Sequence, residues 1–413
     1  MKKVIYGLFD VANSPFTIII ITFIFGPYFA KEIVGDPVKG AAYWQWTSGL
    51  CAVMIAIFGT ILGSISDNIK NGRKYFFILS TTLCIAITTF FYNAMPSKDY
   101  ILYTLIIFFL ANFFYELSQM FYFSYLNDFS DKKNIGYVSG LGFALGYIAI
   151  LPVLYFVLEF FLIPEVTLFS LDKSTFEHIR IIAYVVAIWF LVFSLPIVAI
   201  VLDTTSKQSE NKKIFKSLKE LIWNNGFTIK GKFLIARLFY ADGLIVLITG
   251  GGVYAAGVHG FNTKELLVLA FIGNLIAAIS AFIGGYLNDR FGSKKVIEYC
   301  LIGFILTIIL MVISRNKQEF FVCVMFVAIL AGPLQSASRV LMVNLLDEED
   351  LGKGFGLFTF SARSTSFIGP LLVGTLTFYI SQKYALLAVL PLFFIGYYLF
   401  KSLKLDTDIN SIN

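Results

Sequence analysis

The sequence predicts an all-α membrane protein, with twelve transmembrane helices arranged as two pseudo-symmetric six-helix bundles. Three observations predict this class: the composition, a series of long apolar runs, and a loop pattern that occurs once in each half. Of the 413 residues, 58% are hydrophobic and 14% are charged, whereas about a quarter of the residues of a soluble protein are charged. A chain of this composition needs lipid around its helices, which excludes a soluble globular protein.

Charged or Gly/Pro-rich breaks divide the chain into apolar segments of about 20–25 residues, the length that crosses a bilayer as a helix. The first segment follows Lys2 and Lys3, as a signal peptide would. It is too long and too polar for one and lacks a small-residue cleavage site, so we expect a retained helix. In chain order, the twelve predicted spans are 5–30, 42–66, 74–95, 100–125, 136–161, 179–202, 232–257, 264–287, 295–314, 319–343, 353–380 and 384–403.

Lysine and arginine are distributed unevenly between the two sets of loops. If the N-terminus is cytoplasmic, 20 of the 32 Lys and Arg residues lie on the cytoplasmic side, 9 on the outer side and 3 inside predicted spans. Because cytoplasmic loops are enriched in these residues, we expect both termini in the cytoplasm and a bacterial inner (plasma) membrane location. The net charge of +6 then reflects topology. We expect no nucleic-acid partner, and we expect the basic central loop to lie near anionic membrane lipid.

A long polar segment divides the chain near its middle. Residues 203–231 separate an N-terminal bundle, 1–202, from a C-terminal bundle, 232–413. Within this segment, IFKSLKELIW (214–223) has the apolar spacing of a helix. Two interpretations stay open: a short amphipathic helix on the membrane surface, or a flexible linker.

The two halves repeat one another. The loop GSISDNIKNGRK (63–74) follows the second span and GYLNDRFGSKK (285–295) follows the eighth, with Asp67 and Asp289 at corresponding places. A duplication of six-helix units is typical of transporters, in which two halves rock about a site held between them.

Glycines and prolines also mark the repeat. Gly136 precedes Pro152 by sixteen residues in the fifth span, and Gly354 precedes Pro370 by the same distance in the eleventh. Glycines four residues apart favour close helix contacts that can slide or rock. These pairs are Gly59/Gly63, Gly136/Gly140 and Gly142/Gly146.

The second loop, GYLNDRFGSK (285–294), resembles the signature of the major facilitator superfamily. The first copy departs from it, with Asn68 where an arginine is usual and two extra residues before Gly72. In that family the loop helps to close the cytoplasmic side; simple anchoring of the topology is the alternative. The residues to which the resemblance assigns a conformational gating role are Asp67, Arg73, Asp289 and Arg290.

Further stretches resemble one branch, the vacuole-effluxer-like proteins, a group that includes the fungal autophagy-related amino-acid effluxer. Val11 stands where an aromatic residue is usual, and Ala241 where Asn is common before the aspartate. The resemblance covers nearly the whole chain and implies a secondary transporter, without fixing its substrate. The stretches are FDVANSPF (9–16), GYVSGLGFALGY (136–147), FLIARLFYADG (233–243), GGVYAAG (251–257) and the segment 332–374.

Ionisable residues inside membrane spans are costly, so each is a functional candidate. Asp10 lies about six residues into the first span, roughly 9 Å along a helix axis, with Asn13 at i+3 on the same face. Two interpretations stay open for Asp10: a cavity or proton-coupling role, or a structural pair with an inward arginine. In the seventh span, Asp242 is close to mid-membrane, Tyr240 is expected to line the same passage, and Arg237 is shallow enough to snorkel.

Two further spans carry polar pairs on one face. Glu116 and Gln119 are at i, i+3 in the fourth span, and Gln335 and Arg339 are at i, i+4 in the tenth. Arg339 is near the cytoplasmic end, so snorkelling is its alternative interpretation. The family resemblance implies that the first, fourth, seventh and tenth spans line a central cavity, which agrees with these positions.

Arg363 is about ten residues into the eleventh span and always charged. A buried arginine needs an anion, and three candidates stay open: Asp10, Glu116 or a substrate carboxylate. The full set expected to bind substrate or coupling ion is Asp10, Asn13, Glu116, Gln119, Tyr240, Asp242, Gln335, Arg339 and Arg363.

We therefore expect a monomeric secondary transporter that moves a small polar solute, such as an amino acid, by alternating access coupled to protons or another ion. The chain has no Gly-x-x-x-x-Gly-Lys-Ser/Thr loop and no metal-like spacing of its 4 Cys and 2 His residues. We expect neither a cofactor nor a metal, and no enzymatic activity. The alternatives are a receptor or scaffold of the same fold, and an intramembrane enzyme, for which the sequence has no catalytic motif.

Overall fold

Helices fill the computed structural model, which describes residues 2–131, 133–162, 171–203, 214–261, 263–363, 365–366 and 368–404. These residues contain no β-strand, and Trp223 and Phe227 form an isolated antiparallel bridge. The prediction of an all-α protein is therefore confirmed. The predicted central loop, 203–231, falls partly outside the described residues.

The N-terminal half begins with a long helix that changes geometry along its length. Helix α1 (Lys2–Pro15) continues as π-helical turns at Phe16–Phe23 and Phe29–Ile33, on either side of α2 (Phe25–Tyr28). The other helices of this half are α3 (Pro37–Asn68), α4 (Gly72–Thr89), α5 (Ile101–Ser124), α6 (Ile135–Val157), α7 (Glu177–Arg180) and α8 (Ile182–Asp203). Short 3-10 or π turns extend α4, α5 and α6 at Phe90–Asn93, Leu126–Phe129 and Leu158–Leu162.

The C-terminal half follows a short connecting helix, α9 (Ile214–Ile222), which packs against α3 and α10. A helix in the central segment, one of the two interpretations left open by the sequence, is therefore present. The helices that follow are α10 (Ile229–His259), α11 (Thr263–Phe291), α12 (Ser293–Ile313), α13 (Lys317–Leu345), α14 (Leu351–Arg363), α15 (Ile368–Tyr379), α16 (Gln382–Ala385) and α17 (Leu390–Lys401).

In the described chain, ten helical stretches are long and apolar enough to cross a membrane, and α10 passes the same test as two parts bent by 43°. The predicted span 353–380 is divided between α14 and α15. Pro370 falls in the first turn of α15, where the missing N–H of proline costs the helix no internal hydrogen bond. The count of twelve spans stays a prediction.

Tight turns join corresponding helices of the two halves. Asn71 has a φ of +58° between α3 and α4, and Gly292 has a φ of +82° between α11 and α12. Asn71 has a ψ of 20° and is left-handed helical, a region that Asn tolerates, whereas Gly292 has a ψ of 150°, a region open almost only to Gly. The duplicated loops therefore both turn through a residue with positive φ, but in different conformations.

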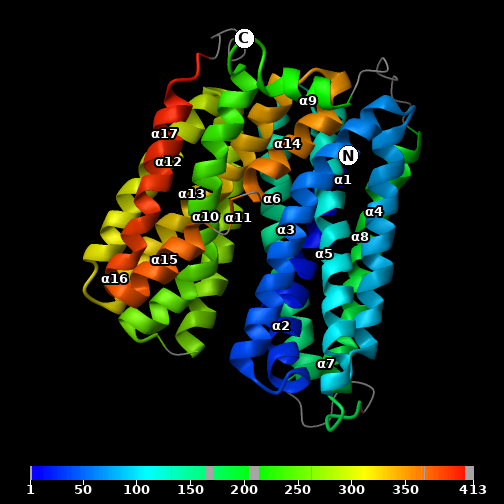
Figure 1. The fold of residues 1–413 in the computed structure, drawn as a ribbon, viewed down its shortest axis with the longest axis vertical. Helices are drawn as coiled ribbons and strands as arrows, with labels where there is room; N and C mark the ends of the chain where they lie inside the picture. The colour runs from blue at the N-terminus through cyan, green and yellow to red at the C-terminus, as the bar shows by residue number, and fades with distance from the viewer. Residues whose placement is uncertain are drawn as a thin grey trace.

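The two bundles are joined mainly at one end. Figure 1 shows α1–α8 and α10–α17 meeting near α9 and α14 and diverging toward α2, α7, α15 and α16. Helix α3 packs along α14, and α6 packs along α11. We call the joined end, which contains Asp67 and Asp289, the closed end, and the opposite end the open end.

Glycines bring the helix backbones together at the closed end. A Cβ on Gly63 would lie 2.4 Å from the carbonyl oxygen of Gly352, and a Cβ on Gly140 would lie 2.4 Å from that of Ala281. A larger residue at either position would force two backbones apart. The predicted close contacts of these glycines are confirmed.

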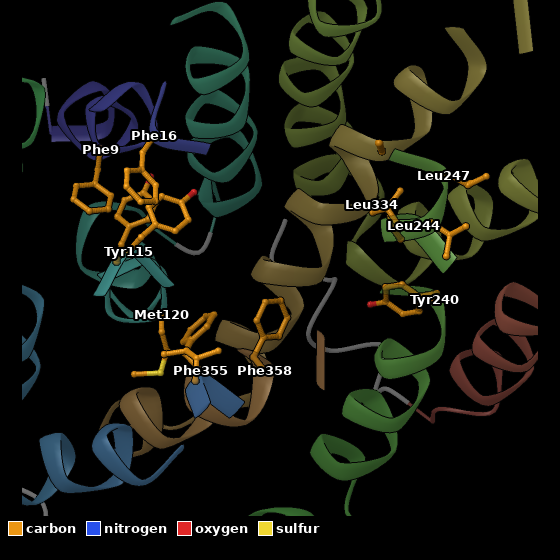
Figure 2. Packing of buried hydrophobic residues seen from close by; sticks show 14 of the residues in the cluster. Phe9, Phe16, Tyr115, Met120, Tyr240, Leu244, Leu247, Leu334, Phe355 and Phe358 are labelled. Carbon is orange, nitrogen blue, oxygen red and sulfur yellow. The ribbon is translucent and has the colours of Figure 1, made fainter. Parts of the chain in front are cut away.

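Aromatic side chains fill the seam between the bundles just beyond these crossings. The ring of Phe123 on α5 lies 6.2 Å from that of Phe355 and 6.5 Å from that of Phe358, both on α14. Figure 2 shows Phe355 and Phe358 beside Met120 of α5. These rings form an apolar contact between α5 and α14.

Candidate functional site

Two acid–arginine pairs cross the seam between the bundles. Asp10 on α1 pairs with Arg339 on α13, and Glu116 on α5 pairs with Arg363 on α14. In each pair the N-terminal bundle supplies the carboxylate and the C-terminal bundle supplies the arginine. Four residues predicted from the sequence are thus brought together in two pairs.

Arg339 is buried inside the N-terminal bundle. Its side chain is 1% exposed, and it donates from Nε to Ser139 Oγ at 3.0 Å and from Nη2 to the Ser139 carbonyl at 2.7 Å. The snorkelling interpretation of Arg339 is wrong, because α6 of the other bundle covers the guanidinium. Four aromatic rings lie 4.5–5.7 Å from its central carbon and provide cation–π contacts, those of Tyr6, Tyr122, Phe123 and Phe143.

Asp10 lies at the centre of this cluster. Its Oδ2 accepts a hydrogen bond from the Tyr122 hydroxyl at 2.6 Å and lies 3.9 Å from Arg339 Nη1. A Cβ on Gly142 would come within 2.3 Å of the same oxygen, so only glycine leaves room for the carboxylate here. The structural pair with an inward arginine, one of the two interpretations of Asp10, is present.

The second pair lies farther from the closed end. Arg363 donates from Nε to Glu116 Oε2 at 3.3 Å and from Nη2 to Glu116 Oε1, a two-pronged arrangement that fits a carboxylate. The Arg363 side chain is 36% exposed and that of Glu116 is 12% exposed. Of the two protein anions considered for Arg363, Asp10 and Glu116, the structure places Glu116 beside it. Unlike Arg339, this arginine is partly accessible.

Polar groups lie beside Glu116 on α5 and on the π-helical turn Phe16–Phe23 that continues α1. Gln119 donates to the Tyr115 hydroxyl at 3.1 Å, and Thr17 donates to the same hydroxyl at 2.8 Å. Across the seam, Gln335 on α13 donates to the Tyr147 hydroxyl on α6 at 3.3 Å. Asn13 instead donates to the Phe9 carbonyl of its own helix at 2.6 Å, so its amide nitrogen satisfies the helix backbone.

At the closed end, the two loop aspartates make equivalent contacts across the seam. Asp67 accepts from the backbone N–H groups of Gly352 and Lys353 at 3.0 and 2.8 Å. Asp289 accepts from those of Gly136 and Tyr137 at 2.6 and 2.7 Å. Each carboxylate therefore binds the start of a helix in the opposite bundle, where free N–H groups and the helix dipole favour negative charge. The two contacts are not at matching positions of the repeat. Asp289 binds Gly136, whose counterpart by its distance from a proline is Gly354, but Asp67 binds Gly352, two residues earlier.

The two loop arginines lie differently. Arg73 donates to the Ser124 carbonyl at 3.2 Å and lies 3.8 Å from the Asp128 carboxylate, both in its own bundle. Arg290 stacks its guanidinium 5.3 Å from the centre of the Phe291 ring beside it. Burial raises the pKa of the Asp128 carboxyl, and Arg73 opposes this rise. The described contacts of both arginines thus stay within one bundle.

In the seventh predicted span, three side chains bind within the C-terminal bundle. Asp242 is buried and accepts from the Gly369 N–H at 3.0 Å. Tyr240 shares a hydrogen bond of 2.8 Å with Ser338. Arg237 does not extend to the membrane surface, because it donates to the Phe358 carbonyl at 2.5 Å and to Ser361 Oγ at 2.8 Å.

Sequence reasoning missed the hydroxyl and aromatic partners of the site. Ser139 and Tyr147 lie in the stretch 136–147, which carried the family resemblance but gave no sign of their contacts. Tyr122 follows Gln119 by three residues on α5 and therefore shares its helix face. That spacing is the one signal that could have identified Tyr122.

Two small cavities lie away from these residues. One of about 90 Å³ lies between α4 and α8, and one of about 210 Å³ lies beside Tyr28, Lys31 and Glu32 toward the open end. The described residues contain no group of three or more His, Cys, Asp or Glu side chains that could hold a metal ion.

Comparison with known proteins agrees with this architecture. A family model described as "Vacuole effluxer Atg22 like" matches residues 30–411. An uncharacterized MFS-type transporter of Bacillus subtilis (strain 168), YxiO, is 25% identical over 380 residues, which cover 89% of this chain and 86% of that protein.

Two solved structures share the fold. The proton:xylose symporter XylE has a TM-score of 0.75 at 13% identity and covers 100% of this chain and 97% of its own. The Escherichia coli fucose:proton symporter FucP has a TM-score of 0.72 at 13% identity, covering 97% of both chains. At this identity the likeness concerns the fold, which is that of the major facilitator superfamily.

Proposed function

This chain belongs to the family described as Vacuole effluxer Atg22 like, and from that premise we propose that it is a secondary transporter moving a small polar solute by alternating access. The observation that carries the proposal is the pair of acid–arginine contacts across the seam, Asp10–Arg339 and Glu116–Arg363. Charges that pair between two rocking bundles must separate and find other partners when the bundles move, which is how a transporter links binding to conformation.

The loop aspartates are the proposed gate. Asp67 and Asp289 each bind a helix start of the opposite bundle, so both contacts break when the closed end opens. We assign the closed end to the cytoplasmic side, with both termini cytoplasmic, because the Lys and Arg residues of the loops are concentrated there. Arg73 and Arg290 hold their loops in place. The open end then faces outward, across the bacterial inner membrane.

The proposed substrate site is the Glu116–Arg363 pair. Arg363 is partly exposed, always charged and pre-organised to bind a carboxylate, and Glu116 provides a negative charge for an amine. A zwitterion such as an amino acid can replace both halves of the ion pair at once, so neither charge is left alone. Gln119, Gln335 and Tyr240 would provide hydrogen bonds for polar groups of the substrate, and Asn13 is the least available because it binds its own helix.

The driving force is proposed to be an ion gradient, with protons as the coupling ion and Asp10, Glu116 and Asp242 as the candidate carboxylates. The protein is proposed to act without a cofactor, as a monomer surrounded by lipid. A receptor or scaffold with this fold is the alternative. It has no need of ion pairs between the bundles, whereas the residues that the structure describes include two.

Transport in proteoliposomes tests the proposal. A mixture of radiolabelled amino acids serves as the probe, after a thermal-shift screen of amino acids, peptides, sugars and nucleosides on the purified protein, since a ligand of the folded state raises its stability. We expect uptake by the wild type, loss of it in Arg363→Ala and Glu116→Gln, and normal uptake in Lys401→Ala, because Lys401 is exposed and its described contact is with Tyr397 of its own helix. Absence of both binding and uptake for every solute class would favour the receptor or scaffold.

A further inference from the structure

Three carboxylates predicted as candidates lie inside membrane spans, and one of them differs from the others. Asp10 and Glu116 each form an ion pair with an arginine of the opposite bundle. Asp242 forms no ion pair with any described residue, although its side chain is only 1% exposed. It is therefore the buried carboxyl group whose charge the described protein does not compensate.

The two oxygens of Asp242 have different surroundings. Oδ2 accepts from the Gly369 N–H at 3.0 Å, at the second residue of α15. Oδ1 is buried without any hydrogen-bond donor among the described residues. A Cβ on Gly369 would lie 2.4 Å from a methyl group of Val246 and 3.1 Å from Oδ1, so the carboxyl group is held tightly against α15.

The arginines described on α10, α13 and α14 bind other groups. On the same helix, Arg237 binds Phe358 and Ser361. From α14, Arg363 binds Glu116, and from α13, Arg339 binds Ser139. Tyr240, on α10 itself, shares its hydroxyl with Ser338, and the ring that packs on Gly243 from α17 is that of Phe393, which carries no charge.

A lone carboxylate inside a membrane is costly, whereas a neutral carboxylic acid can be buried with one hydrogen bond. We propose that Asp242 is the binding site of the coupling proton. The step is a proton transfer only: the carboxylate takes a proton from water on one side of the membrane, and after the bundles move it returns that proton to water on the other side. The proposal rests on the transport function proposed above and names its coupling site.

The position of Asp242 provides a route from the proton to the substrate pair. The helix is interrupted between α14 and α15. Arg363, the last residue of α14, contacts Glu116, and Gly369, in the first turn of α15, contacts Asp242. A negative charge at a helix start stabilises it, and protonation removes that charge. Proton binding at Asp242 therefore weakens the anchoring of α15 and alters the break beside Arg363, without direct contact between Asp242 and the substrate.

Infrared spectroscopy tests the proton site independently of transport. Full-length protein in lipid is titrated, and the carbonyl stretch of a neutral carboxylic acid is followed. We expect an acid band that titrates in the wild type and in Asp10→Asn but is lost in Asp242→Asn. Asparagine keeps an oxygen that can accept from Gly369, so the fold should survive, which gel filtration checks. A titrating band unchanged in Asp242→Asn overturns the proposal.

Transport gives the second arm, with the radiolabelled amino-acid mixture as the probe. We expect Asp242→Asn to lose accumulation driven by a pH gradient while it keeps exchange at equal concentrations. Accumulation that persists in this variant, or that follows a sodium gradient in place of the pH gradient, overturns the proposal. If the wild type transports nothing in the mixture, the proposed function fails for this substrate class, and the infrared arm still decides whether Asp242 binds a proton.

Discussion

The Arg339 guanidinium, carried by the C-terminal bundle, donates to the Ser139 carbonyl inside the N-terminal bundle at 2.7 Å. A side chain of the C-terminal bundle thus hydrogen-bonds the backbone of the N-terminal bundle. Because the arginine is buried and 3.9 Å from Asp10, separating the bundles at this end exposes two charges together. Arg339 is therefore expected to hold the closed end shut.

Replacing Arg339 should open the closed end. Arg339→Ala leaves Asp10 buried without its cation, which should cost the closed conformation about 3–5 kcal/mol. Arg339→Lys should cost less, because it keeps the charge and loses the forked donors to Ser139. The distance distribution between spin labels at Lys70 and Glu349, both exposed at this end, should shift to longer values. The background variant lacks Cys51, Cys84, Cys300 and Cys323, which are buried.

Lys401→Ala is the matched control for this experiment, since Lys401 is exposed and its described contact, with Tyr397, stays within α17. An unchanged label distance in Arg339→Ala would show that the arginine does not hold the gate.

The two loop aspartates should contribute separately to the gate. Asp67→Asn and Asp289→Asn each keep an acceptor oxygen and remove the charge at a helix start, so each should weaken the closed state by about 0.3–2 kcal/mol. They bind different helices of opposite bundles, so the double variant should show the sum of the two effects. The same spin-label pair measures all three variants, and a double variant no more open than either single one contradicts independent action.

Gly142→Ala should push α6 away from α1 and lower the stability of the protein. The added methyl would lie 2.3 Å from Asp10 Oδ2, and overpacking of this kind typically costs about 1–3 kcal/mol. Gly251→Ala is the control, because nothing lies within 4 Å of a Cβ there. Thermal unfolding of the purified protein should show a lower midpoint for Gly142→Ala and little change for Gly251→Ala. Equal midpoints would mean that α1 can move away from α6 without loss.

Exchanging the charges of Glu116 and Arg363 separates pairing from substrate binding. Glu116→Arg and Arg363→Glu each place two like charges together, so each single variant should be destabilised. The double variant restores the pair and should recover thermal stability. If Arg363 also binds a substrate carboxylate, uptake should stay low in the double variant, since the two charges have changed places. Full recovery of uptake argues that the pair serves only to join the bundles.

Sequence patterns predicted the helical class, the repeat and most of the charged site residues, because each depends on local composition and spacing. Arg363 was recognised as needing an anion, but the choice between Asp10 and Glu116 depends on how α14 meets α5, which spacing along one chain does not encode. The sequence places Arg339 near the cytoplasmic end of the tenth predicted span, which suggests a side chain that reaches the membrane surface. It is buried because α6 of the other bundle covers it, and such burial follows only from the packing of the two halves.

The division of the eleventh span was also beyond the sequence pattern. Residues 353–380 are apolar enough throughout to be one span, and Pro370 alone marked a disturbance. Proline is tolerated inside α6 and α13, at Pro152 and Pro333, so its presence does not decide between a kink and a break. Contact with Asp242 at the start of α15 accompanies the break here.

The space beside Asp10 couples the residue types that positions 10 and 142 can have. Since Asp10 Oδ2 occupies the volume that a side chain at position 142 would need, the residues at positions 10 and 142 cannot vary independently. A relative that carries alanine at the second place should carry a smaller side chain at the first, and one that keeps the aspartate should keep the glycine. If alanine replaced Gly142 while Asp10 was still present, the methyl group would collide with the carboxylate. Evolutionary substitutions at these two positions should therefore occur together.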